Sequence, residues 1–133
     1  MSINPRISLY FVTLGLFALA MLSSGVMNIL QPPRLLESMS HLGYPTYVLV
    51  IVGVWKLLGA LAIAVPGLPR LKEWAYAGFT FELSGAVISH LVSGDGPGKA
   101  AFPLALLALG LTSWALRPSS RRISTSAQLS ANA

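Results

Sequence analysis

The sequence predicts an all-α fold: a polytopic membrane protein whose four transmembrane helices form a bundle with both termini in the cytoplasm. Of its 133 residues, 54% are hydrophobic and only 10% are charged, whereas soluble domains have about 45–50% apolar and about 25% charged residues. The apolar residues gather in four long segments, which short segments rich in proline, glycine and charge separate. Composition and segment length together exclude an ordinary soluble domain.

The first predicted span covers residues 7–30, which contain no charged side chain. A helix of this length rises about 36 Å and can cross a bilayer with some tilt. A cleaved signal peptide is the alternative, but its apolar core has only about 7–15 residues. Pro32 and Pro33 end the helix, because proline donates no backbone hydrogen bond and disfavours a helical conformation in the residue before it.

Three further spans are predicted after a polar connection. In that connection Leu35, Met39 and Leu42 have the spacing of a short helix that lies in the membrane interface. The predicted spans cover residues 45–65, 74–92 and 100–116. A Pro-Gly-Leu-Pro turn at 66–69 and a polar turn at 93–99 separate them. Residues 1–117 are therefore predicted to form the membrane domain, and residues 118–133, which have little apolar content, a disordered cytoplasmic tail.

The distribution of basic residues predicts the orientation. With the N-terminus inside, the cytoplasmic segments carry Arg6, Arg70, Lys72, Arg117, Arg121 and Arg122, and the outer segments carry only Arg34 and Lys99. This bias follows the positive-inside rule and places both termini in the cytoplasm. Because these basic residues are few and scattered, the net charge of +5 does not indicate nucleic-acid binding.

Two charges lie inside predicted spans, Lys56 in the second and Glu82 in the third. The helical rise places each within about 1.5 Å of the bilayer midplane, on consecutive antiparallel helices. A lone charge at that depth costs about 2.5–3.5 kcal/mol, so pairing in the bundle interior is expected to offset much of the cost. The alternative is that burial keeps one of the two groups neutral.

The surroundings of this pair predict a polar vestibule that opens outward. Small residues on the same helix faces allow close helix contact and leave room for the two side chains. His90 lies about 11 Å outward from the midplane, with Asn28 at a similar level and Ser89 almost directly above Glu82. The ligand-binding candidates are Lys56, Glu82, Ser89, His90, Asn28 and Trp55, and the catalytic candidates are Glu82, Lys56 and His90.

Each of these residues also has a structural interpretation. In that interpretation the Lys56–Glu82 pair fixes the helix register and has no further role, and His90 is an interfacial or hydrogen-bonded histidine. The absence of cysteine excludes thiol redox chemistry and cysteine-ligated metal. No metal is expected, because His41 and His90 lack the paired spacing of a metal site, and no nucleotide-binding motif is present.

Two motifs carry a family resemblance. Gly53-Val54-Trp55-Lys56-Leu57-Leu58-Gly59 and Leu71-Lys72-Glu73-Trp74-Ala75-Tyr76-Ala77-Gly78 are similar to the DoxX-like family of small bacterial membrane proteins. The resemblance covers about residues 7–117. It implies a four-helix, multi-pass protein of the bacterial cytoplasmic (inner) membrane. The family takes its name from a subunit associated with thiosulfate and quinone oxidoreduction.

Three functions remain open from the sequence. The first is an accessory protein that binds a small lipophilic molecule, such as a quinone, in the bundle. The second is a quinone-linked oxidoreductase or isomerase subunit, in which Glu82 exchanges a proton, Lys56 is its electrostatic partner and His90 is an outer relay. The third is a structural partner subunit or a small carrier. The expected partners are the lipid bilayer and either another membrane protein or a second copy of the chain.

Overall fold

The computed structural model describes residues 3–123, and these are almost entirely helical. The elements are α1 (Pro5–Leu30), α2 (Pro33–Leu42), α3 (Tyr47–Ala64), α4 (Pro69–Val92), α5 (Gly96–Ala115) and a short 3-10 helix, η1 (Ser119–Arg121). Residues 3–123 contain no β-strand. The predicted all-α fold is therefore confirmed.

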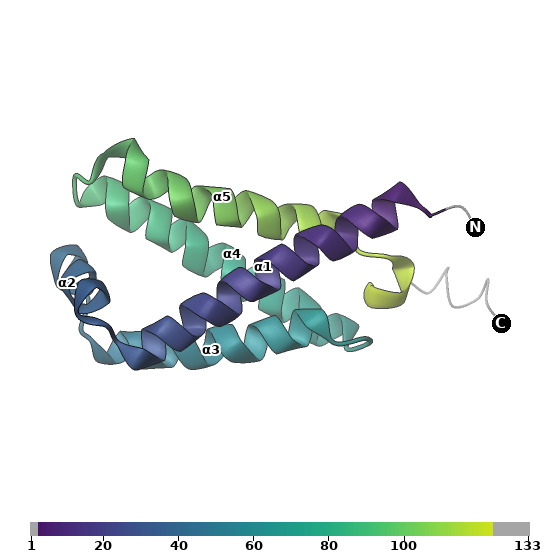
Figure 1. Cartoon of the computed structure of the whole chain (residues 1–133), viewed down its shortest axis with the longest axis horizontal. Coiled ribbons are helices and arrows are strands. Elements are labelled where there is room, and N and C mark those ends of the chain that lie inside the picture. The colour runs from purple at the N-terminus through teal and green to yellow at the C-terminus, as the bar shows by residue number, and fades with distance from the viewer. Residues whose placement is uncertain (1–2, 124–133) are drawn as a thin grey trace.

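The four long helices surround a common interior, and the short helix α2 lies at one end of them. The most extensive contacts join α1 to α3 and α4 to α5, and contacts between α3 and α4 and between α1 and α5 close the ring. Figure 1 shows α2 at one end of the molecule and the described chain ends at the other. A short helix was predicted after the first span, and it is present as α2.

Three of the helices, α1, α3 and α5, are long and apolar enough to cross a membrane. The helix α4 has 24 residues, but it is not among them. Its first two turns contain Arg70, Lys72 and Glu73, and Glu82 lies near its middle. These charged residues lower the hydropathy of α4, and α4 is therefore not among the candidate spans.

Two helices begin earlier than the sequence predicts. The helix α4 begins at Pro69 rather than near residue 74, and α5 begins at Gly96 rather than near residue 100. Each has a proline in its first two positions, where the missing amide hydrogen would have no helical partner in any case. The expected polar turn at 93–99 is shorter for this reason.

Aromatic packing fills the end of the interior away from α2. Phe17 on α1 is almost fully buried, and its ring meets Phe79 of α4 edge to face at 5.3 Å between centroids. Toward the α2 end, α1 and α3 approach through Gly25 and Gly53. A Cβ on Gly53 would lie 2.8 Å from the Gly25 carbonyl oxygen, so only glycine allows this helix separation.

The ordered part of the chain extends beyond residue 117. Ser119–Arg121 form η1, and the Arg121 guanidinium donates to the Tyr10 hydroxyl and to the carbonyls of Ile63 and Ala64. Helix ends leave carbonyls without donors, so this contact gives the start of the expected disordered tail a structural role. Residues 124–133 of that tail lie outside the described residues.

Candidate functional site

The two charges predicted at the midplane form an ion pair. Lys56 Nζ on α3 lies 2.8 Å from Glu82 Oε1 on α4 and also donates to Ser24 Oγ on α1, at 2.8 Å. The Lys56 side chain is 10% exposed and that of Glu82 is 27% exposed. Three helices therefore meet at this pair. The predicted pairing is present, while its functional role remains a prediction.

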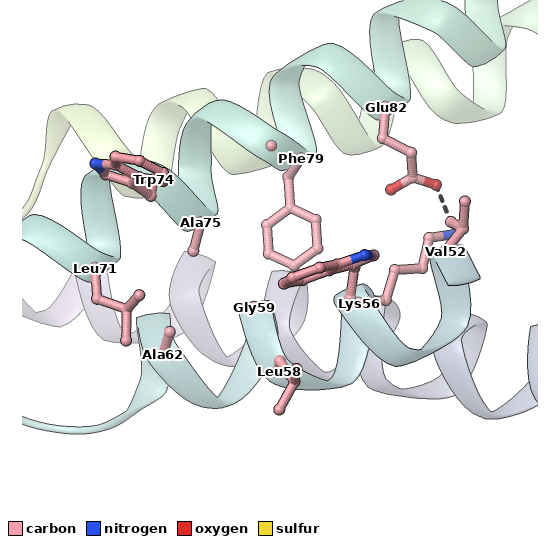
Figure 2. Close-up of a pocket in the computed structure, with 12 residues that line it drawn as sticks. Val52, Lys56, Leu58, Gly59, Ala62, Leu71, Trp74, Ala75, Phe79 and Glu82 are labelled. Atoms are coloured by element: carbon pink, nitrogen blue, oxygen red, sulfur yellow. Dashed lines mark ion pairs between the residues drawn. The ribbon is translucent and has the colours of Figure 1, made fainter. Parts of the chain in front are cut away.

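An apolar groove runs along the molecule between α3 and α4, and we call it the lateral groove (Figure 2). Its volume is about 650 Å³. It is lined by Val52, Trp55, Lys56, Leu58, Gly59, Ala62, Leu71, Trp74, Ala75, Gly78, Phe79 and Glu82. Figure 2 shows the ion pair at one end of the groove and Trp74 and Leu71 toward the other. Among residues 3–123, the charged groups that line this groove are thus those of the ion pair alone.

Small residues create the lateral groove. The Phe79 ring fits against Gly59, where an added Cβ would lie 2.8 Å from the ring. At Gly78 an added Cβ would meet nothing within 4 Å, so the groove is open there. Trp55 and Trp74 border the groove and are 68% and 80% exposed. Sequence reasoning missed this groove, although a glycine and a tryptophan on each of two adjacent helices are a signal for it.

A second cavity lies beneath α2, between the ends of the long helices, and we call it the axial cavity. Its volume is about 490 Å³, and its lining residues come from all five α-helices. Ser24, Asn28, Lys56 and Glu82 contribute polar groups to it. Because Lys56 and Glu82 line both spaces, the ion pair stands between the lateral groove and the axial cavity.

The candidate residues from the sequence divide between these two spaces. Asn28, Ser89 and His90 line the axial cavity, whereas Trp55 lines only the lateral groove. Asn28 is 6% exposed and has no hydrogen bond from its side chain to any residue in 3–123. Its amide is therefore free to meet a molecule in the cavity.

Above the cavity, Asp95 joins the two histidines of the chain. Its carboxylate oxygens lie 2.6 Å from His41 Nε2 on α2 and 2.7 Å from His90 Nδ1 on α4. Hydrogen bonding to His90, and then to His41, holds the pKa of Asp95 below its ordinary value despite the opposing effect of desolvation. A second bridge joins Tyr44, just after α2, to Ser89 at 2.7 Å between oxygens. We call Asp95, His41, His90, Tyr44 and Ser89 the outer clasp.

In the outer clasp, His90 bonds to Asp95, a partner that sequence reasoning did not predict. The sequence placed His41, His90 and Asp95 near the outer mouth, but it did not indicate that one carboxylate would contact both rings. The Asp95 side chain is 6% exposed, and Lys99 Nζ lies 3.9 Å from it. Within residues 3–123, no group of three or more histidine, aspartate or glutamate side chains is arranged to hold a metal ion.

The sequence profile of the DoxX-like family matches residues 12–113 of this chain. The chain belongs to the DoxX-like family. The match includes all of α2, α3 and α4, and hence the whole ion pair, both histidines and Asp95. Comparisons with curated proteins and with solved structures give no match. Family membership, together with three helices that are apolar enough to span a bilayer, makes this DoxX-like protein a membrane protein.

Proposed function

We propose that this DoxX-like protein is an accessory protein of the bacterial cytoplasmic membrane that binds a small lipophilic molecule of the quinone type in the lateral groove. All four long helices span the bilayer in this proposal, and both termini face the cytoplasm. The observation that carries it is the position of the Lys56–Glu82 pair at one end of an otherwise apolar groove.

The chemistry of the groove fits an amphipathic molecule. Its volume of about 650 Å³ falls within the range of about 300–1,000 Å³ that is usual for ligand sites. An apolar body would pack between α3 and α4 against Phe79 and the small residues. A carbonyl oxygen at the head of the molecule would accept a hydrogen bond from Lys56, and a hydroxyl group there would donate one to the Glu82 carboxylate.

The distribution of basic residues and the same ion pair support the proposed placement in the bilayer. The positive-inside bias puts both termini on one side, and an even number of spans satisfies that condition. The glutamate of α4 is costly in lipid only while it is unpaired, and Lys56 pairs with it at 2.8 Å. The exposed rings of Trp55 and Trp74 then face the acyl chains, so the groove opens to the membrane rather than to water.

Tryptophan fluorescence tests the proposal directly. The chain has three tryptophans, and two of them, Trp55 and Trp74, line the groove. Decylubiquinone titrated into nanodiscs that hold the protein should quench their emission in a saturable manner. A variant with Phe in place of both residues retains only Trp114 and reports the quenching caused by quinone dissolved in the lipid.

A pair of glycine variants locates the site. Gly78→Leu fills the groove, whereas Gly15→Leu makes the same change on α1 outside both spaces, and neither position has an atom within 4 Å of the added Cβ. Leucine is also the better helix former by nearly 1 kcal/mol, so both variants should fold. We expect Gly15→Leu to behave as wild type and Gly78→Leu to bind at least about tenfold more weakly. Equal quenching in the two variants would refute binding in this groove.

A further inference from the structure

The axial cavity contains polar groups that the fold does not use. Asn28 is buried but makes no side-chain hydrogen bond with the described residues, and its amide offers both donors and an acceptor. Ser24 accepts from Lys56 and keeps its own hydroxyl hydrogen for another partner. No fully buried side-chain nitrogen or oxygen among the described residues lacks a hydrogen-bond partner, so the unpartnered Asn28 amide keeps accessible surface. It and the half-buried Ser24 can therefore bond to a molecule in the cavity that both line.

The charges around the cavity restrict that molecule. Lys56 and Glu82 neutralise each other, and Asp95 above them is engaged by both histidines and has Lys99 at 3.9 Å. A charged ligand would therefore enter a low-dielectric space without a free counter-charge, at a high desolvation cost. The cavity favours a neutral ligand.

The remaining walls of the axial cavity favour an aromatic ligand. Met21, Phe81, Leu83 and Phe102 line the cavity with aromatic, thioether and aliphatic groups. Sulfur and ring edges make favourable contacts with an aromatic ring, while the polar groups at the floor need a hydroxyl or carbonyl oxygen.

We infer that the axial cavity is a second binding site, separate from the lateral groove, that takes a small uncharged aromatic compound bearing a hydroxyl or carbonyl group, with α2 as its cover. This inference does not depend on the proposed function of the groove. It assigns the cavity a ligand that arrives from the side of α2.

The helix α2 has the features of a cover. None of its residues is buried, and the apolar side chains of Leu35, Met39 and Leu42 line the cavity below it. Its connection to α1 passes through Gln31, which has a left-handed backbone (φ 51°), and its C-terminal end is followed by Gly43 (φ 83°). Side-chain bonds of the outer clasp hold that second end. Few contacts have to break for α2 to lift.

The test uses 4-fluorophenol as the probe, with fluorine NMR on nanodiscs that hold the full chain. Gly85 lines the axial cavity on α4, and a Cβ added there meets nothing within 4 Å, so Gly85→Leu is the cavity counterpart of Gly78→Leu. We expect saturable binding in wild type, Gly15→Leu and Gly78→Leu, and at least about tenfold weaker binding in Gly85→Leu. Empty nanodiscs correct for partition into lipid.

A second variant and a second probe keep the result decisive. Asn28→Leu retains similar bulk but removes the amide, and it should weaken 4-fluorophenol while leaving fluorobenzene, which lacks the hydroxyl, unchanged. Wild-type binding of 4-fluorophenol by both Gly85→Leu and Asn28→Leu would overturn the inference. So would its loss in Gly78→Leu alone, because the phenol would then occupy the groove. Retention of decylubiquinone quenching by Gly85→Leu distinguishes this site from the proposed groove site.

Discussion

Two buried lysines in this bundle perform different tasks. Lys56 pairs directly with the Glu82 carboxylate between the lateral groove and the axial cavity. Lys72, which is fully buried, instead donates to the backbone carbonyls of Ala62 (2.8 Å) and Val65 at the end of α3. Among the described residues, Lys72 has no carboxylate within 4.0 Å. The difference shows that a buried lysine in a helical membrane protein can donate to the free carbonyls of a helix end or contribute a polar group to a cavity.

Chemistry explains why the two environments differ. A helix C-terminus presents carbonyls without donors and the negative end of the helix dipole, so one ammonium group satisfies several acceptors there. Arg121 reaches the neighbouring carbonyls of Ile63 and Ala64 and completes the same arrangement. The Lys56 ammonium lies away from any helix end, and within the described part of the chain its bonds are those to Ser24 and Glu82.

The largest predicted effect is at Lys72. Lys72→Met keeps the apolar stem but leaves the carbonyls of Ala62 and Val65 without their donor, at about 1–3 kcal/mol for each group left unsatisfied. We expect a clear fall in the thermal unfolding midpoint, measured by circular dichroism in detergent micelles. Lys99→Met is the control, since that side chain is 66% exposed and should be replaced without measurable loss. Equal midpoints for the two variants would remove the structural role assigned to Lys72.

The next effect concerns the ion pair, and a double variant separates its contributions. Lys56→Met leaves Glu82 without its partner in a poorly solvated site, so it should destabilise the protein more than the combined Lys56→Met and Glu82→Leu change. The same unfolding measurement on the two single variants and the double variant gives the coupling. Recovery of stability in the double variant is the expected result.

Binding by that double variant then decides what the pair does. If the proposed function is correct, decylubiquinone quenching is lost although the fold is retained. A double variant that is folded and still binds would identify the pair as a clasp between α3 and α4 and not as part of the site.

The sequence predicted Lys56 and Glu82 more successfully than Lys72, for a physical reason. Depth along an apolar segment can be counted from residue numbers, so two charges at equal depth on consecutive helices were expected to pair, and they do. Lys72 follows a turn, where a lysine normally lies in the interface. Its burial comes from folding back onto the end of α3, where Arg121 also donates, and no local pattern contains that information.

The lateral groove and the axial cavity were likewise only partly predictable from the sequence. Residue spacing placed Asn28, Ser89 and His90 around an outer vestibule, and these residues line the axial cavity. The lateral groove depends on how far α3 and α4 separate along their length, which side-chain packing between Phe79 and Gly59 sets. The contact of Asp95 with both histidines depends in turn on where α2 folds back, so it could not be read from periodicity.

The smallest predicted effect is the pH dependence of the outer clasp. Because hydrogen bonds from His90 and His41 lower the pKa of Asp95 below its ordinary value of 3.8, its stabilising contribution is complete above that value and is lost only as the pH falls through the lowered pKa. The difference in thermal midpoint between wild type and Asp95→Asn should therefore be constant from neutral pH to about pH 4 and decrease only at lower pH. Glu37→Gln, a change at an exposed carboxylate on α2, should show no such difference. If the difference in thermal midpoint already disappears near neutral pH, the outer clasp depends on another titrating group. Lys72 bonds to uncharged carbonyls and needs no carboxylate, so its contribution should not change over the same pH range. Only the α2 end of the molecule would then respond to acid.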